Sequence, residues 1–319
     1  MIVVASFCFL FLSLALVLGV FAWYTRGTVR RIEEALPPLG SMIEVDGQQL
    51  HVRDQGGGPA LVLLHGLGGQ MRHFDFGAMA DLRLGFRVIS VDRPGSGYSR
   101  RAKGQSAVLA AQARTIAALI DKLGLERPTV VGHSLGGAVA LQLALDYPQT
   151  VGALALVAPL SHVPERVPAV FQALAIRPRW LCALFAHTLA LPATVIGGGR
   201  LMARVFGPEP VPRDFATRGG GLLALRPSQF LAGAADLASL RTHMPPLERR
   251  YRDLTVPLSV LYGRDDELLD WRANGRQLVD QVPGARLHLT DGGHMLPITR
   301  PTVTADFIAQ AAAERKLAA

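Results

Sequence analysis

The chain has 319 residues, of which 50% are hydrophobic and 18% charged, and this composition excludes an intrinsically disordered protein. Two cysteines, Cys8 and Cys182, are too few for a disulfide framework or a cysteine-rich zinc module. The net charge of +8 comes mostly from arginines that are scattered along the chain and form no basic run. Nucleic-acid binding is therefore not expected.

The N-terminal residues 2–24 carry no charged side chain. About 20 apolar residues suffice to cross the hydrocarbon core of a bilayer as a helix, and Trp23 and Tyr24 stand where an aromatic belt would lie. We predict a transmembrane anchor at residues 1–24. A cleaved signal peptide is the alternative, although no basic residue precedes the apolar run and residues 20–22 form a poor cleavage site.

The charges that follow the apolar run indicate its orientation. Arg26, Arg30 and Arg31 come directly after it, and no basic side chain precedes it. The positive-inside rule then predicts a single-pass protein, of an inner membrane, with the large domain in the cytoplasm. A periplasmic domain is the alternative.

Residues 25–40 are charged and predict a juxtamembrane linker, in which Pro37 and Pro38 end any helix. A β-hairpin is predicted at 42–53, because Asp46-Gly47 is a typical turn pair. Short apolar runs predict buried strands at 60–64, 86–91, 129–132, 151–157, 258–262 and 286–289, and helices are predicted at 107–123, 135–147 and 306–317. This alternation predicts an α/β domain at 41–319, with a mostly parallel sheet covered by helices on both faces.

The alternation is interrupted at residues 160–252. Pro, Gly and Arg are frequent there, no convincing strand is found, and only 169–176, 180–191 and 230–240 have helical patterns. We therefore predict a helical insertion of roughly 90 residues between two parts of one sheet.

A candidate nucleophile lies in Gly132-His133-Ser134-Leu135-Gly136. This G-x-S-x-G pattern stands between a predicted strand and a predicted helix, the context that a nucleophile elbow requires. The glycines permit a strained turn, and the helix N-terminus below Ser134 favours developing negative charge. The alternative is a tight structural turn with an inert serine.

Acyl transfer also needs two backbone N–H donors for the oxyanion. The Gly-rich turn at 65–69 follows an early buried strand, so we expect the N–H groups of Leu67 and Leu135 to form this pair. His65 is interpreted as a structural hydrogen-bonding residue of the turn, and the alternative is that the turn merely ends the strand.

A serine nucleophile needs a base and an orienting carboxylate. His294 lies in a Gly-rich loop directly after the last predicted strand. The preceding strand is followed by Gly263-Arg264-Asp265-Asp266, which offers two adjacent carboxylates, with Asp270 nearby. The chain order Ser, Asp, His is the order of the α/β arrangement with a nucleophile elbow.

Five motifs together resemble the α/β-hydrolase superfamily: the His-Gly turn at 65–67, D-R-P-G-x-G-x-S at 92–99, G-H-S-L-G-G at 132–137, G-R-D-D at 263–266 and G-G-H-M at 292–295. They cover essentially residues 40–319, and the insertion at 160–252 lies where the family carries its helical cap. The resemblance is greatest to capped bacterial esterases, C–C hydrolases and cofactor-free haloperoxidases. It implies Asp266 as the triad acid, three residues after the glycine, and a structural role for Asp92.

The serine at the elbow separates the chain from haloalkane dehalogenases and epoxide hydrolases, which carry Asp there. We expect a serine hydrolase that cleaves a carboxylic ester of a hydrophobic small molecule through an acyl-enzyme, with Ser134, His294 and Asp266 as triad and no cofactor or metal. The alternatives are a C–C hydrolase or a perhydrolase with the same triad, or a non-catalytic ligand-binding member of the fold.

The predicted cap carries aromatic side chains that allow two interpretations. They either bind an acyl or aromatic group of the substrate or form the core of the cap itself: Phe171, Trp180, Phe185, Phe206 and Phe230. The sequence does not choose between them, and it leaves the oligomeric state open.

Overall fold

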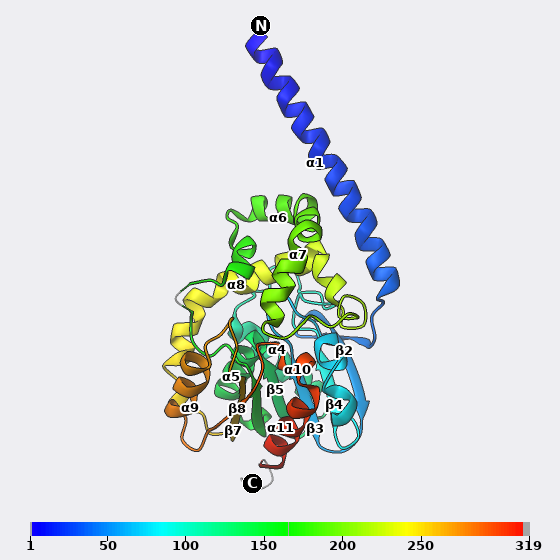
Figure 1. Cartoon of the computed structure of the whole chain (residues 1–319). Helices are drawn as coiled ribbons and strands as arrows, with labels where there is room; N and C mark the ends of the chain where they lie inside the picture. The colour runs from blue at the N-terminus through cyan, green and yellow to red at the C-terminus, as the bar shows by residue number, and fades with distance from the viewer. Residues whose placement is uncertain (1, 165, 315–319) are drawn as a thin grey trace.

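A computed structural model describes residues 2–164 and 166–314, and Figure 1 shows its arrangement. Eight strands form one sheet in the order β1-β2-β4-β3-β5-β6-β7-β8. The strands are β1 (Ser41–Val45), β2 (Gln48–Gly56), β3 (Ala60–Leu64), β4 (Arg87–Val91), β5 (Thr129–His133), β6 (Ala153–Val157), β7 (Leu258–Gly263) and β8 (Arg286–Thr290). Only β1 with β2 and β2 with β4 pair antiparallel, so the prediction of a mostly parallel sheet is confirmed.

The hairpin at the sheet edge follows from its turn. Asp46 and Gly47 both have positive φ, 51° and 69°, as a type I′ turn requires. Strand β2 extends past the predicted end of the hairpin at residue 53, and its last residue, Gly56, pairs with Arg87 of β4.

Helices cover both faces of the sheet. One face packs against α4 (Leu109–Lys122), α5 (Leu135–Asp146) and α9 (Gln277–Gln281), and the other packs against α3 (Met79–Leu82), α10 (Leu296–Thr299) and α11 (Pro301–Glu314). A short α2 (Arg72–Asp75) follows the turn after β3, and residues 272–276 form one π-helical turn before α9. The last helix therefore begins five residues before the predicted start at 306, and residues 315–317 of that prediction lie outside the described residues.

Helix α1 (Ile2–Ala35) is one continuous helix that projects away from the body of the molecule (Figure 1). It is long and apolar enough to cross a membrane, a property that signal sequences near an N-terminus share. The helix runs without a break through the predicted boundary between an anchor at 1–24 and a linker at 25–40. It ends just before Leu36-Pro37-Pro38, as the prolines dictate.

The insertion folds over the sheet as a helical cap. It contains 3-10 turns at Ala169–Ala175 and Gly221–Leu225 (η2 and η3) and the helices α6 (Arg179–Thr188), α7 (Ala190–Phe206) and α8 (Pro227–Glu248). Figure 1 shows α6 at the end of the cap that is farthest from the sheet. The sequence analysis missed most of α7, because Gly197-Gly198-Gly199 breaks its helical pattern.

Candidate active site

The carboxyl ends of β3, β5, β7 and β8 bring the candidate residues to one edge of the sheet. In open α/β sheets the ligand site lies outside the carboxyl ends of the strands. Ser134 lies between β5 and α5 with φ 54° and ψ −122°, a conformation that costs free energy for a residue with a side chain. The predicted strand–turn–helix context of Ser134 is therefore present.

The glycines of the elbow are needed because other backbone lies close to them. A Cβ on Gly136 would lie 2.1 Å from the Leu64 carbonyl oxygen, and a Cβ on Gly132 would lie 2.6 Å from the Gly136 carbonyl oxygen. A Cβ on Gly66, in the turn after β3, would lie 2.9 Å from Ser134 Cβ. This close packing holds the turn after β3 beside the candidate nucleophile.

Asp266 and His294 are brought together across 28 residues of sequence. His294 Nδ1 and Asp266 Oδ2 lie 2.7 Å apart, and both residues are buried. Asp266 Oδ1 accepts hydrogen bonds from the backbone N–H groups of Leu268 and Leu269, at 2.9 and 3.0 Å. The carboxylate is thus fixed in place, and it holds the Nδ1 side of the His294 ring.

The two neighbouring carboxylates have other partners. Asp265 faces outward and is exposed, and its Oδ2 also accepts the Gly292 N–H at 3.3 Å. Asp265 therefore helps to hold the loop that carries His294. Asp270 Oδ1 accepts the Arg272 N–H at 2.9 Å, just before the helical turn at residues 272–276.

The two residues that are expected to supply the oxyanion donors, Leu67 and Leu135, line one pocket with Ser134. Leu135 is the first residue of α5, so its N–H has no partner within the helix. Leu67 and Leu135 both border a small side pocket together with Ser134 and His294. The two backbone segments thus border the same small pocket.

Buried polar side chains fix the turn that carries Leu67. Arg93, which is fully buried, donates hydrogen bonds to the carbonyl oxygens of His65 (2.8 Å) and Gly66 (3.1 Å). Its guanidinium also pairs with Asp236 of cap helix α8 at 3.0 Å. Asp236 in turn contacts Arg101 Nη2 at 3.2 Å. One buried ion cluster thus connects the cap to the candidate oxyanion turn.

Three histidines near the site are held neutral by burial. His65 Nδ1 contacts the Gly66 carbonyl and its Nε2 accepts the Arg93 N–H, while burial and the Arg93 charge hold the pKa of His65 well below its usual value. Burial also lowers the pKa of His133 well below normal, and that of His73 to about 4. His65 is therefore a structural residue of the turn, as expected.

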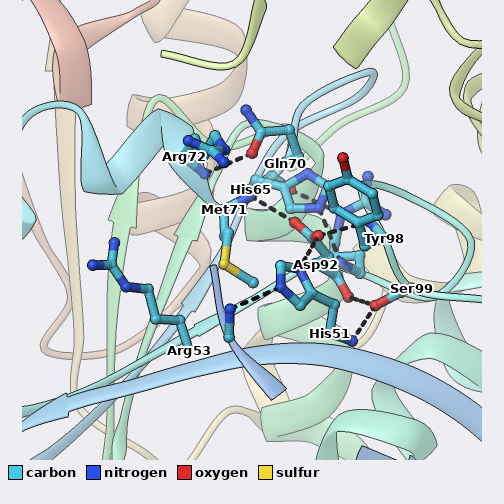
Figure 2. Close-up of polar contacts among 12 residues, drawn as sticks. His51, Arg53, His65, Gln70, Met71, Arg72, Asp92, Tyr98 and Ser99 are labelled. Atoms are coloured by element: carbon cyan, nitrogen blue, oxygen red, sulfur yellow. Dashed lines mark hydrogen bonds and ion pairs between the residues drawn. The ribbon is translucent and has the colours of Figure 1, made fainter. Parts of the chain in front are cut away.

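A second grouping of Ser, His and Asp surrounds Asp92 (Figure 2). His51 Nδ1 lies 2.7 Å from Asp92 Oδ2, and Asp92 Oδ1 accepts the Met71 N–H at 2.8 Å. However, His51 Nε2 accepts the Gly40 N–H, and Ser99 Oγ donates to the Asp92 carbonyl oxygen. Because its histidine has no free nitrogen and its serine bonds to backbone, this grouping is structural, in line with the role expected for Asp92.

A cavity of about 570 Å³ lies between the sheet edge and the cap, and Ser134 and His294 line it. Its walls are mostly apolar, and Arg213 is the permanently charged side chain among its described lining residues. Of the cap aromatics, Phe171 and Phe230 line the cavity, Phe185 packs on Phe230, Phe206 is buried in the cap, and Trp180 is 67% exposed. The cap aromatics are thus divided between the cavity wall, the interior of the cap and its exposed surface.

Three contributors to the site were missed by the sequence analysis. His133 Nε2 donates to the His294 carbonyl oxygen at 3.0 Å and ties the elbow to the histidine loop. Glu209, after α7, accepts the Gly293 N–H at 3.0 Å. Asp236 reaches Arg93 across 143 residues of sequence. Of these three residues, only His133 could have been found from the local sequence, because it lies inside the elbow motif.

Within residues 2–164 and 166–314, no three His, Cys, Asp or Glu side chains lie close enough to hold a metal ion.

Comparisons with known proteins agree with this architecture. A model of the alpha/beta hydrolase fold matches residues 59–301. The chain is 32% identical to an uncharacterised protein of Mycobacterium tuberculosis, over 85% of this chain and 80% of that protein. It is 30% identical to a 2-hydroxy-6-oxononadienedioate/2-hydroxy-6-oxononatrienedioate hydrolase of Burkholderia vietnamiensis, over 82% and 90% of the two chains.

Among solved structures, that of a membrane phospholipase A, described as a bacterial virulence factor, superposes with a TM-score of 0.72 at 22% identity, covering 99% of this chain and 98% of that one. At this identity the superposition concerns the fold. With the family model covering most of the domain and the motifs in their expected places, the chain belongs to the α/β-hydrolase family.

Proposed function

We propose that this hydrolase cleaves a carboxylic ester of a hydrophobic molecule through an acyl-enzyme on Ser134. The observation that carries the proposal is the buried Asp266–His294 pair beside a strained serine at the base of an apolar cavity. A serine, a histidine or an aspartate alone is common near a cavity. This chemistry requires a nucleophile, a base and an orienting acid together at one site.

The proposed steps give each of these groups one role. His294 Nε2 accepts the Ser134 proton as Oγ attacks the ester carbonyl carbon, and Asp266 stabilises the imidazolium. The N–H groups of Leu67 and Leu135 receive the oxyanion; removing one such donor costs about 3 kcal/mol of transition-state stabilisation. His294 then protonates the leaving alcohol and activates a water molecule, which releases the acid and restores the serine.

Cleavage of a carbon–carbon bond by the same groups is the second candidate, because a relative at 30% identity is named as a hydrolase of dienedioates. Such a substrate carries two carboxylates. The lining of this cavity offers one permanent positive charge, Arg213, which favours a neutral acyl group over a dicarboxylate. A perhydrolase reaction would use the same acyl-enzyme, with peroxide in place of water.

We further propose that α1 is an uncleaved anchor that leaves the hydrolase domain in the cytoplasm. The helix is continuous past residues 20–22, the candidate cleavage site. Its second half is held by the domain, because Ile32 and Leu36 are buried against Leu223 of the cap. The arginines after the apolar run support the orientation.

The test of the activity is labelling by a fluorophosphonate, followed by hydrolysis of p-nitrophenyl esters of increasing chain length. Ser134→Ala should lose both labelling and turnover, whereas Ser99→Ala, which alters the other Ser–His–Asp grouping, should keep labelling. A folded Ser134→Ala protein that still hydrolyses the esters contradicts the mechanism. Turnover of a ring-cleavage dienone but of no ester favours the second candidate, and a wild-type protein that is never labelled favours a ligand-binding role.

A further inference from the structure

The outer side of the cap carries an unusual number of exposed apolar side chains. Outside α1, six of the ten exposed large hydrophobic residues in the described chain lie on α6, on α7 or between them; we call these six the cap outer face: Trp180, Leu181, Leu184, Leu189, Val195 and Ile196. Trp180 is 67% exposed and Ile196 is 89% exposed. Soluble surfaces rarely gather so many large apolar groups without a partner.

The cap outer face lies beside the proposed anchor. Thr25, which directly follows the predicted anchor at 1–24, is buried, and its Oγ1 donates to the Thr188 carbonyl oxygen of α6 at 3.4 Å. Further along α1, Glu33 pairs with Arg226 at 3.2 Å. Figure 1 shows α6 on the side toward which α1 projects. When α1 spans a bilayer with Trp23 in the interface, α6 therefore lies at the level of the membrane surface.

The charge of the segment that carries the cap outer face favours binding to an anionic surface. Residues 166–206 contain no acidic side chain, and all of their arginines are exposed: Arg166, Arg177, Arg179, Arg200 and Arg204. Near an anionic leaflet, each such charge contributes about 1 kcal/mol of attraction. Segments that lie in the bilayer interface typically combine a tryptophan and aliphatic side chains with basic residues and no acidic ones.

The bend in this region argues against a straight second membrane span. Segments Ala169–Ala175 and Arg179–Thr188 together are apolar enough for a span, but they meet at an angle of 116°. Neither is long enough to cross a bilayer alone. An orientation along the membrane surface satisfies both their composition and their bend.

We propose that the cap outer face docks onto the surface of a bilayer that contains anionic phospholipid, as a second membrane contact beside α1. The docked helices then separate the bilayer from the cavity, because α7 presents Thr194, Gly198 and Leu201 to the cavity. The proposal rests on the proposed role of α1 as an anchor, and its test reports on the two separately.

The test uses the three tryptophans of the chain, Trp23, Trp180 and Trp271, as depth reporters. Three full-length double variants each keep one tryptophan and have Phe at the other two positions. They are reconstituted in vesicles of phosphatidylcholine and phosphatidylglycerol that contain dibrominated acyl chains. Trp180 is expected to be quenched by bromines near the headgroups, Trp23 to be quenched, and Trp271, beyond the cap, to be unaffected.

Each outcome decides one element of the proposal. Quenching of Trp23 without Trp180 overturns docking and leaves the anchor standing, whereas no quenching of Trp23 contradicts the anchor and the docking together. Protection of Trp180 by a second copy of the chain, detected by cross-linking, also overturns docking. Equal quenching of Trp180 in vesicles of phosphatidylcholine alone overturns the requirement for anionic lipid.

Substitutions on the exposed surface complete the test without disturbing the core. In the protein that keeps only Trp180, Val195→Ser together with Ile196→Ser should reduce quenching at least twofold, while Leu84→Ser, an equally exposed apolar residue outside the cap, should leave it unchanged. Arg179→Gln with Arg200→Gln removes two of the five exposed arginines and should weaken the preference for phosphatidylglycerol by a corresponding share. If neither pair changes the quenching, the cap outer face is not the membrane contact.

Discussion

The buried pair of Arg93 and Asp236 predicts a large and non-additive loss of stability. The two side chains are 0% and 1% exposed and lie 3.0 Å apart, and Arg101 and Gln112 also contact the Asp236 carboxylate at 3.2 Å. Asp236→Ala would leave the Arg93 guanidinium charged, buried and without its counter-charge. Removing one partner of such a pair costs about 3–5 kcal/mol, because the desolvation of the remaining charge is no longer compensated.

For a domain of this size, that loss lowers the midpoint of thermal unfolding by roughly 6–10 °C at about 2 °C per kcal/mol. The double variant Arg93→Met with Asp236→Ala should lose clearly less than the sum of the single variants, since both members of the pair are then absent. The control is Asp54→Ala, which breaks the half-exposed pair with Arg87 and should cost about 0–1 kcal/mol.

The assay is thermal unfolding of the full-length proteins in detergent, together with kcat on a p-nitrophenyl ester. Because Arg93 holds the His65 and Gly66 carbonyls, kcat should fall in Asp236→Ala even at temperatures where the protein is folded. Additive losses in the double variant, or a loss no larger than that of the control, would show that the ion cluster does not connect cap and turn as inferred.

Three further predictions follow from the site and the anchor. Asp266→Asn should lower kcat by about 10⁴, whereas Asp265→Asn and Asp270→Asn keep their acceptor oxygens and should change kcat only slightly; steady-state kinetics of the three variants decides, and a crippled Asp265→Asn would mean that the wrong carboxylate was assigned. Stability should fall as the pH falls from 6.5 toward 4, because His73 stays neutral when folded and takes up a proton when unfolded; the midpoint should drop less between pH 7 and pH 5 in His73→Gln than in the wild type. Full-length protein should partition with membranes and a chain that begins at Arg26 should be soluble, as fractionation would show; intact protein in the soluble fraction contradicts the anchor, and a chain that starts near Trp23 indicates a signal peptide.

Most of the sheet could be predicted from the sequence because its strands are short, continuously apolar and separated by helices of clear periodicity. The run at 60–64 and the strand β3 have the same limits, and the Asp46-Gly47 turn set the register of the hairpin. The end of β2 was missed because Gly56-Gly57-Gly58 carries no strand signal. Its pairing with β4 depends on a long-range contact that no local pattern encodes.

The candidate site was predictable to the extent that its residues stand in loops at strand ends. Ser134, Asp266 and His294 each follow a strand of the parallel sheet, so the topology alone brings them to one edge. Spacing also distinguished Asp266 from Asp265, but the hydrogen bond from Asp265 to the Gly292 N–H was not visible, since it requires the relative position of two loops.

What the sequence could not supply is the connection between cap and site. Asp236 lies on a helix whose sequence pattern gives no reason to single out this carboxylate. It nevertheless pairs with Arg93, the arginine that fixes the candidate oxyanion turn. Glu209 similarly holds the backbone of the histidine loop from the cap side. Because both contacts join the cap to groups beside Ser134 and His294, the position of the cap bears on the geometry of the site as well as on the shape of the cavity. A membrane surface that fixes the cap would therefore also stabilise the arrangement of the oxyanion turn.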